Sequence, residues 1–271
     1  MKYPNLTGKQ LIDWLVANKQ DVIDAKKAIV KHADASFALP TLEKEFAVKG
    51  KYLFEDNIEA GTIKRTVIAN TYLYMDSHDD VHLENTFTNS IEQRKSRPQP
   101  HLYDHQFSVL AKVGKSLNYT ERSISWRELG IGKTGMTTAL FLESEIKKAY
   151  NEKVYDAYLD GAIDQHSVGM RYIKIALAVN DEENYPNEYK VWEENIAKIG
   201  NRAQVEKQGY FFAVSEAALL ETSAVLEGSN GLTPTLGNKS DEPLDNIQKD
   251  EVVVEPLKAL DINGVLENYL K

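Results

Sequence analysis

One polar cluster stands out in the chain for its density of chemically active side chains. It runs from Asp76 to His82, and Asp76, His78, Asp80 and His82 fall at every second position. On an extended strand these four side chains would share one face, and imidazoles with carboxylates are ligands for zinc or iron. The alternative is a polar strand end and turn, because Asp and Ser side chains hydrogen-bond to nearby backbone.

Three further stretches hold candidates for nucleophilic chemistry. They are His101–His105, Asp160–Met170 with Ser167 near its end, and Leu219–Val225 with Glu221 at its centre. A serine at a strand start beside a small residue can present its hydroxyl, and a histidine from elsewhere could take the proton. A glutamate in a largely apolar segment needs a partner if it is buried. Taken singly, these residues also fit structural roles: Ser167 as an ordinary hydrogen-bonded serine and Glu221 as a solvent-facing strand residue.

The four stretches occur in one order, and that order resembles a known family. The positions concerned are Asp76, Asp80, Val81 and Phe87; Leu102, Tyr103, His105, Val113 and Gly114; Gly161, Ala162, Ile163, Ser167, Val168, Gly169 and Met170; and Leu219, Glu221, Ser223, Val225 and Asn230. Together they are similar to the prohead (capsid maturation) serine proteases of tailed phages, which are related to the herpesvirus assemblins. Departures from the family pattern are Glu84, Asn85, Met170, Gly228 and Ser229, and residues 180–210 form an insertion of unknown role.

The resemblance implies a fold and an activity. The fold would be α+β, a largely antiparallel assemblin-like β-barrel with flanking helices. The activity would be that of a serine endopeptidase, in which Ser167 attacks the peptide carbonyl, His105 accepts and returns the proton, and Glu221 orients His105. The substrates would be the scaffold and major capsid proteins and the protease itself, inside the procapsid in the host cytoplasm. Self-association is a further expectation, and no cofactor, metal, nucleic acid or membrane is expected.

Strand alternation argues against other polar residues near the candidate site as members of it. A neighbour in an extended chain points to the opposite face, so Asp104 and His166 are expected to face away from His105 and Ser167 respectively. Glu216 would likewise face away from Glu221. Two alternatives to the protease remain: an inactive virion structural or scaffold protein with the same fold, and a metal-dependent hydrolase using Asp76, His78, Asp80 and His82.

The elements that must position these residues follow from the apolar periodicity. A capping box at Thr7 and Gln10 and an apolar stripe predict a helix over residues 8–31. Alternation predicts strands over residues 46–54, 67–75 and 136–142. A further strand is expected over residues 166–179, and residues 210–225 are expected to be extended or mixed. Spacings of three and four predict helices over residues 143–160 and from Pro186, with Gly200 at the end of the second. This succession predicts the α+β class with a largely antiparallel sheet.

Composition and charge limit the remaining possibilities. The chain has 271 residues and no Cys, which excludes thiolate chemistry. Its net charge of −9 argues against duplex nucleic acid as a partner. No apolar run approaches the roughly 18–20 residues of a membrane span. We divide the chain into an N-terminal helical segment (1–40), a protease domain (41–230) and a linker with an acidic tail (231–271). The tail ends in an apolar patch, Val265, Leu266, Tyr269 and Leu270, suited to docking on this chain or on a partner.

Overall fold

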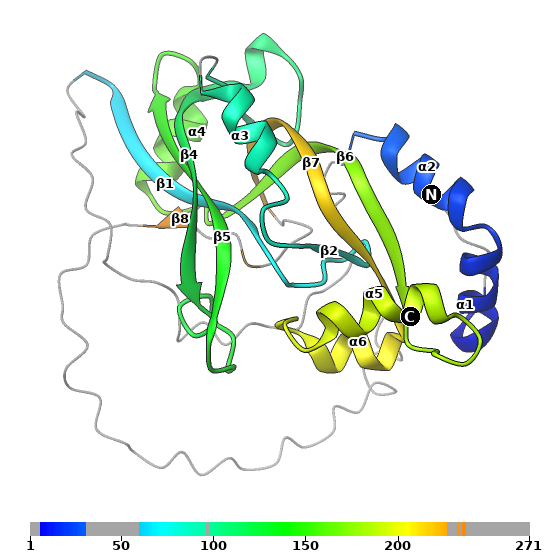
Figure 1. Cartoon of the computed structure of the whole chain (residues 1–271). Helices are drawn as coiled ribbons and strands as arrows, with labels where there is room; N and C mark the ends of the chain where they lie inside the picture. The colour runs from blue at the N-terminus through cyan, green and yellow to red at the C-terminus, as the bar shows by residue number, and fades with distance from the viewer. Residues whose placement is uncertain (1–5, 31–59, 96–97, 227–231, 233–234, 237–271) are drawn as a thin grey trace, which may run out of the picture. The chain divides into compact units, whose positions relative to one another are not determined.

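All the strands of the computed structural model join one mixed sheet (Figure 1). The structure describes residues 6–30, 60–95, 98–226, 232 and 235–236. The strands are β1 (Thr62–Thr71), β2 (Asp80–His82), β3 (Pro100–Tyr103), β4 (Lys112–Ser125), β5 (Met136–Lys147), β6 (Gln165–Val179), β7 (Tyr210–Val225) and β8 (Thr235–Leu236). Their order is β2-β7-β3-β4-β5-β1-β8, and β6 pairs with β7.

The sheet is antiparallel except where two short strands meet β7. Both β2 and β3 run parallel to β7, while β6 pairs with it antiparallel along nearly its whole length. Across the described strands the ladders do not return to their starting edge. The α+β class and the largely antiparallel sheet are therefore confirmed, whereas a closed barrel is not shown.

The helices are α1 (Gly8–Ala17), α2 (Lys19–Ala28), α3 (Thr88–Arg94), α4 (Glu152–Leu159), α5 (Pro186–Ile196) and α6 (Arg202–Gln208). The single helix predicted over residues 8–31 is interrupted at Asn18, whose side-chain amide donates to the Trp14 carbonyl. The predicted capping box does not form, because the Thr7 side chain makes no capping hydrogen bond. Leu15 and Val22 pack with side chains of β6 and β7, so this helical segment docks on the sheet. In the described residues no helix is both long and apolar enough to span a bilayer.

The helix predicted over residues 143–160 is wrong in its first half. Residues 143–147 continue β5, where they pair with β1 on one side and β4 on the other. Helix α4 starts only at Glu152, after Asn151 caps it by accepting from the Val154 amide at 3.1 Å. The long-range ladders outweigh a local spacing that fits a helix.

The strands β6 and β7 match their predicted ranges closely, and α5 begins at Pro186 as expected. The expectation for Gly200 is wrong, since α5 ends at Ile196. A Cβ at Gly200 would lie 2.7 Å from the Trp126 ring, so this glycine permits a close packing contact instead. The predicted strand over residues 46–54 and the tail patch lie outside the described residues. Within the predicted linker, Leu232 is buried and β8 pairs with β1.

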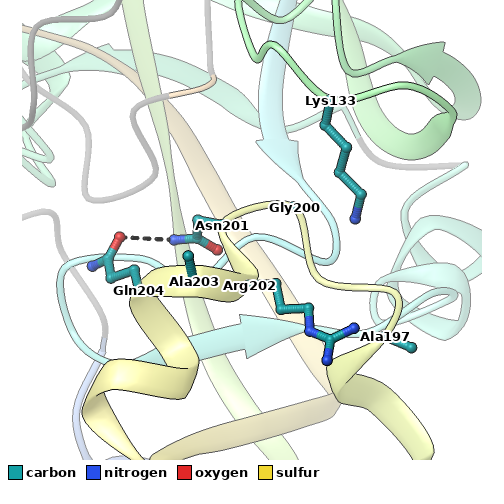
Figure 2. A pocket seen from close by; sticks show the side chains of 7 residues that line it. All are labelled: Lys133, Ala197, Gly200, Asn201, Arg202, Ala203 and Gln204. Atoms are coloured by element: carbon teal, nitrogen blue, oxygen red, sulfur yellow. Dashed lines mark hydrogen bonds between the residues drawn. The ribbon is translucent and has the colours of Figure 1, made fainter.

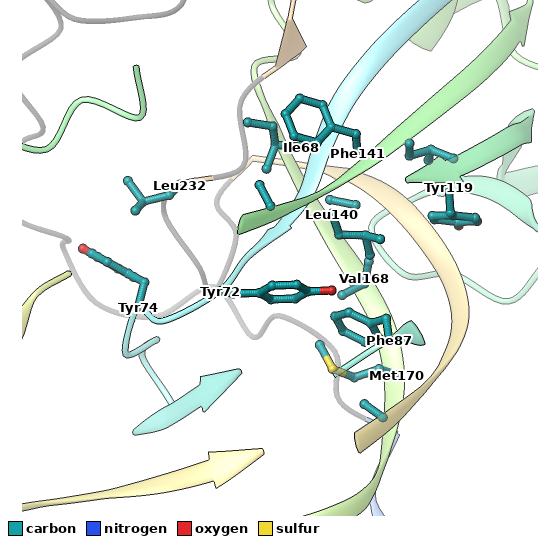
Figure 3. Close-up of a cluster of buried hydrophobic side chains, with 14 of the residues drawn as sticks. Ile68, Tyr72, Tyr74, Phe87, Tyr119, Leu140, Phe141, Val168, Met170 and Leu232 are labelled. Carbon is teal, nitrogen blue, oxygen red and sulfur yellow. The ribbon is translucent and has the colours of Figure 1, made fainter. Parts of the chain in front are cut away.

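The main hydrophobic cluster holds the larger β-strands together (Figure 3). Phe141 and Leu140 come from β5, Ile68 from β1 and Val168 from β6, and the Tyr72 ring stacks near Phe87 at a centroid distance of 6.0 Å. All of these side chains are buried. This cluster fixes β6 and, through its ladder, β7, the two strands that carry the candidate site.

Candidate active site

Four of the sequence-selected residues lie on one face of the β6–β7 ladder. Ser167 stands opposite Ser223, and Gly169 stands opposite Glu221. Directly opposed residues of an antiparallel pair project from the same face, with Cβ atoms about 4.5–5.5 Å apart. We call this face the site face. Glu221 is completely buried there, while Ser167 keeps 7% of its surface exposed.

A tight turn after β3 delivers His105 to the site face. Strand β3 runs beside β7, and the Asp104 amide still donates to the Ala224 carbonyl at 3.0 Å. Asp104 and His105 then both adopt left-handed backbone, with φ of 48° and 52°. Such conformations are costly for residues other than glycine and are held only where surrounding contacts enforce them. One such contact is the hydrogen bond from the His105 amide to Ser223 Oγ, at 3.1 Å.

The His105 imidazole and the Glu221 carboxylate are directly bonded. His105 Nδ1 lies 2.6 Å from Glu221 Oε1, and the Ser223 hydroxyl donates to Glu221 Oε2, also at 2.6 Å. The expected hydrogen bond between His105 and Glu221 is confirmed, whereas no hydrogen bond joins Ser167 to His105 among the described residues. Because a carboxylate only accepts, Nδ1 carries the hydrogen and Nε2 is left as the basic nitrogen.

Gly169 makes room for this carboxylate. A Cβ at position 169 would lie 2.2 Å from Glu221 Oε1 and 3.0 Å from its carboxyl carbon. A side chain at position 169 would overlap the Glu221 carboxylate. The Glu221 side chain can therefore cross β6 only because residue 169 is a glycine. The glycine in the Ser-Val-Gly sequence at 167–169 is thus explained by the space that the Glu221 side chain requires.

The structure also separates the rival residues from the site. Glu216 forms an ion pair with Lys174 at 2.5 Å and accepts from Asn89 at 2.9 Å. Glu221, and not Asp104, is bonded to the His105 ring. Ser223 is the functional candidate that sequence reasoning missed. It was part of the motif, but nothing in the sequence indicated that its hydroxyl joins His105 to Glu221.

The opposite face of the same strands carries a second histidine cluster. His166, one residue from Ser167, bonds through Nε2 to the Tyr158 hydroxyl at 2.9 Å, and that hydroxyl also bonds to His101 Nε2 at 3.0 Å. His101 Nδ1 lies 2.7 Å from Ser144 Oγ. We call these four residues the rear cluster. Burial lowers the pKa of His101 to about 3, so its imidazole is neutral.

The Asp76–His82 stretch forms a polar turn. Asp76 Oδ1 accepts from the backbone amides of His78 and Asp80 at 2.8 and 2.9 Å, and Asp79 has left-handed backbone. Asp80 pairs with Lys26 of α2 at 2.5 Å, and His82 Nδ1 lies 3.0 Å from the Asn70 amide nitrogen. The described part of the chain has no group of three acids or histidines placed to hold a metal ion. The turn interpretation is the one that the structure supports.

A surface pocket of about 390 Å³ is lined mainly by residues 197–204 (Figure 2). It is found where α5 gives way to α6 and shares no residue with the site face. Lys133 reaches it from the β4–β5 connection and donates to the Ile199 carbonyl at 2.8 Å. The lining residues are Lys133, Ala197, Gly200, Asn201, Arg202, Ala203 and Gln204.

Comparison of the chain with protein-family models, with curated proteins and with solved structures found no match. The chemistry of the site face and the motif order in the sequence are therefore the observations that bear on function.

Proposed function

We propose that the protein is a serine endopeptidase with Ser167 as nucleophile, His105 as general base and Glu221 as the residue that orients His105. The observation that carries the proposal is the buried hydrogen bond between His105 Nδ1 and Glu221 Oε1, at 2.6 Å, on the face that also bears Ser167. A histidine fixed by a carboxylate beside a serine is the arrangement that activates a hydroxyl for acyl transfer.

The chemistry would proceed in two halves. The Ser167 oxygen attacks the peptide carbonyl carbon while its proton passes to His105 Nε2, and the imidazolium then gives this proton to the leaving amine. Water enters, loses a proton to the same nitrogen and attacks the ester carbon. The bond to the Ser167 oxygen then breaks, the imidazolium returns the proton to that oxygen, and the acid is released. Throughout, Nδ1 keeps its hydrogen and its bond to Glu221.

Burial of Glu221 strengthens its effect on His105. The carboxylate has no exposed surface, so solvent screens it little. Its second oxygen is fixed by Ser223, which limits the orientations that the carboxylate can take. When His105 becomes positively charged during the reaction, Glu221 offsets that charge at a distance of one hydrogen bond.

The biological setting belongs to the same proposal and comes from the motif resemblance. The substrates would be the scaffold and major capsid proteins of a tailed phage, together with the protease's own chain, and the site of action would be the procapsid in the host cytoplasm. The assemblin-like form of the fold is part of this proposal, supported by the α+β class and the mixed sheet.

A fluorophosphonate probe tests the nucleophile directly. The full chain should gain one phosphonyl group, and peptide mass spectrometry should locate it on Ser167. Ser167→Ala should abolish the labelling, and Ser77→Ala, on an exposed turn, should leave it unchanged. Ser223→Ala should slow the labelling about tenfold without moving the adduct, because it loosens Glu221 and removes no reacting atom.

The result also separates the protease from its main alternative. An inactive virion structural or scaffold protein with this fold would fold normally and gain no adduct. An adduct on a serine other than 167 would contradict the assignment of the nucleophile.

A further inference from the structure

The loop that follows His105 exposes apolar side chains. Phe107 is 62% exposed, Val109 is 90% exposed and Leu110 is 83% exposed. The loop runs from Gln106 to Ala111 and contains no charged residue. Single exposed apolar residues are common. Three within four positions, next to His105, form an apolar patch of the kind that marks a binding surface.

The backbone of this loop is nevertheless well fixed. The Gln106 amide donates to the Tyr103 carbonyl at 3.1 Å, and the Ala111 amide donates to the Ser108 carbonyl at 3.1 Å. Ser108 Oγ accepts from the Leu110 amide at 3.2 Å, which starts a short 3-10 helix over Val109–Ala111. Ala111 is buried and anchors the end of the loop. The apolar side chains are therefore displayed from an ordered support, as in a preformed binding surface.

Chain geometry places the loop within reach of a bound substrate. Phe107 is two residues and Leu110 five residues from His105, and a chain spans at most about 3.5 Å per residue, so Leu110 lies within roughly 18 Å of His105. An extended peptide covers about 3.3 Å per residue. Substrate residues up to about five positions from the cleaved bond could thus contact the loop.

We propose that residues 106–111 select the substrate by binding apolar side chains of an extended polypeptide on one side of the cleaved bond. This inference rests on the proposed protease function and adds the class of sequence that the site accepts. The occupant is a polypeptide with uncharged, apolar side chains, because the loop offers apolar contact and no counter-charge. A second copy of the chain is disfavoured, since three side chains offer much less than the ~800 Å² per partner of a standard interface.

A peptide library tests the selection. The wild-type chain, the Val109→Asp/Leu110→Asp double variant and a Met136→Asp control are each incubated with an equimolar library of 14-residue peptides, and the products are sequenced by mass spectrometry. Met136 is 57% exposed and pairs with Ser125, at the end of β4 remote from the loop. It therefore introduces one carboxylate at an exposed apolar residue away from the loop, where the double variant introduces two in the loop.

The wild type and the control should cut bonds that have an apolar residue two to five positions away. The double variant should raise KM for those peptides at least tenfold with kcat changed less than twofold, because apolar pockets discriminate by about 10–200-fold. It should also gain cleavage of peptides with Lys or Arg at the same positions, since the new carboxylates would bind them.

Three other results would overturn the inference. Identical cleavage preferences in the wild type and the double variant would show that the loop does not contact substrate. A dimer by light scattering that dissociates in the double variant, with preferences unchanged, would assign the patch to a second copy. A wild type that cuts no peptide and takes no fluorophosphonate label would remove the proposed function itself, whereas normal labelling with unchanged preferences removes only the role of the loop.

Discussion

His101 and His105 lie four residues apart at the end of β3, yet their surroundings differ in the property that matters for catalysis. His105 is bonded to a carboxylate, and the site face around it includes Ser167, which is 7% exposed. His101 is bonded to two neutral hydroxyl groups, those of Ser144 and Tyr158, and is completely buried. The first environment places a carboxylate against the ring, whereas the second excludes an imidazolium ion, because burial lowers the pKa of His101.

The hydrogens of the rear cluster follow from its partners. Ser144 donates to the Lys115 carbonyl at 3.1 Å, so its oxygen accepts from His101 Nδ1. His101 Nε2 then accepts from the Tyr158 hydroxyl, whose oxygen accepts from His166 Nε2. The cluster thus ties β3, β5, β6 and α4 together by neutral hydrogen bonds. Side-chain partners, and not the histidines themselves, therefore distinguish the site face from the face that carries the rear cluster.

Removing the charge of Glu221 should have the largest effect on activity. Glu221→Gln keeps the shape of the side chain but cannot stabilise a positive His105, so kcat/KM for a cleaved peptide should fall about 10³–10⁴-fold. Glu216→Gln is the matched control and should change kcat/KM less than threefold, because Glu216 pairs with an exposed lysine away from the site. The opposite ranking of the two variants would show that the wrong carboxylate has been assigned.

Adding one methyl group at Gly169 should have the next largest effect. The new Cβ of Gly169→Ala would overlap Glu221 Oε1 at 2.2 Å, so the carboxylate must move and its alignment with His105 is lost. We expect kcat/KM to fall about 10²-fold and the free energy of unfolding to fall by about 1–3 kcal/mol. At Gly132 a Cβ would meet no atom within 4 Å, so Gly132→Ala should preserve both quantities. Full activity in Gly169→Ala would mean that Glu221 can orient His105 from another position.

The sequence was sufficient to predict the two strands that carry the site. Residues 166–179 are predicted to form a strand and residues 210–225 to be extended or mixed, and their ladder brings Ser167 and Glu221 to one face. Motif order was sufficient to select His105. The turn that places His105 was not predictable, because two consecutive left-handed residues, Asp104 and His105, have no local sequence signal and depend on contacts with β7.

The remaining failures share one physical cause, which is that long-range contacts decide them. The residues of the rear cluster come from four elements, and no spacing rule connects His101 with Tyr158 and His166. Residues 143–147 fit a helical spacing but pair with two neighbouring strands. Local patterns indicate which segments form helices or strands, whereas pairing across the sheet determines where those elements end and which neighbours they contact.

The Tyr158 hydroxyl tests the structural role of the rear cluster. Tyr158→Phe would leave the Nε2 atoms of His101 and His166 without this partner, so the free energy of unfolding should fall by about 2–3 kcal/mol. Activity per folded molecule should fall less than fivefold, since the site face is unchanged. Tyr155→Phe is a close control on the same helix, because the buried Tyr155 hydroxyl makes no hydrogen bond among the described residues. Urea unfolding of both variants gives the comparison. Equal stability of the two variants would show that the hydrogen bonds of Tyr158 contribute nothing net.

The smallest expected effect is the contribution of His101 to acid sensitivity. Its pKa is lowered by burial from 6.5 to about 3 in the folded protein, so between these values the unfolded chain binds a proton that the folded chain does not. This contribution to stability is complete above pH 6.5 and is lost as the pH falls toward 3; between pH 7 and pH 5 the loss is about 2 kcal/mol. His101→Asn retains a donor for Ser144 but cannot titrate. The free energy of unfolding of this variant should be lower than that of the wild type at pH 7. On acidification to pH 5 it should fall by about 2 kcal/mol less than that of the wild type. His78→Asn, at a partly exposed turn position, should keep the wild-type pH dependence. Urea titrations at pH 5, 6 and 7 measure this difference, and parallel stability curves for the wild type and His101→Asn would show that His101 does not resist protonation in the folded state.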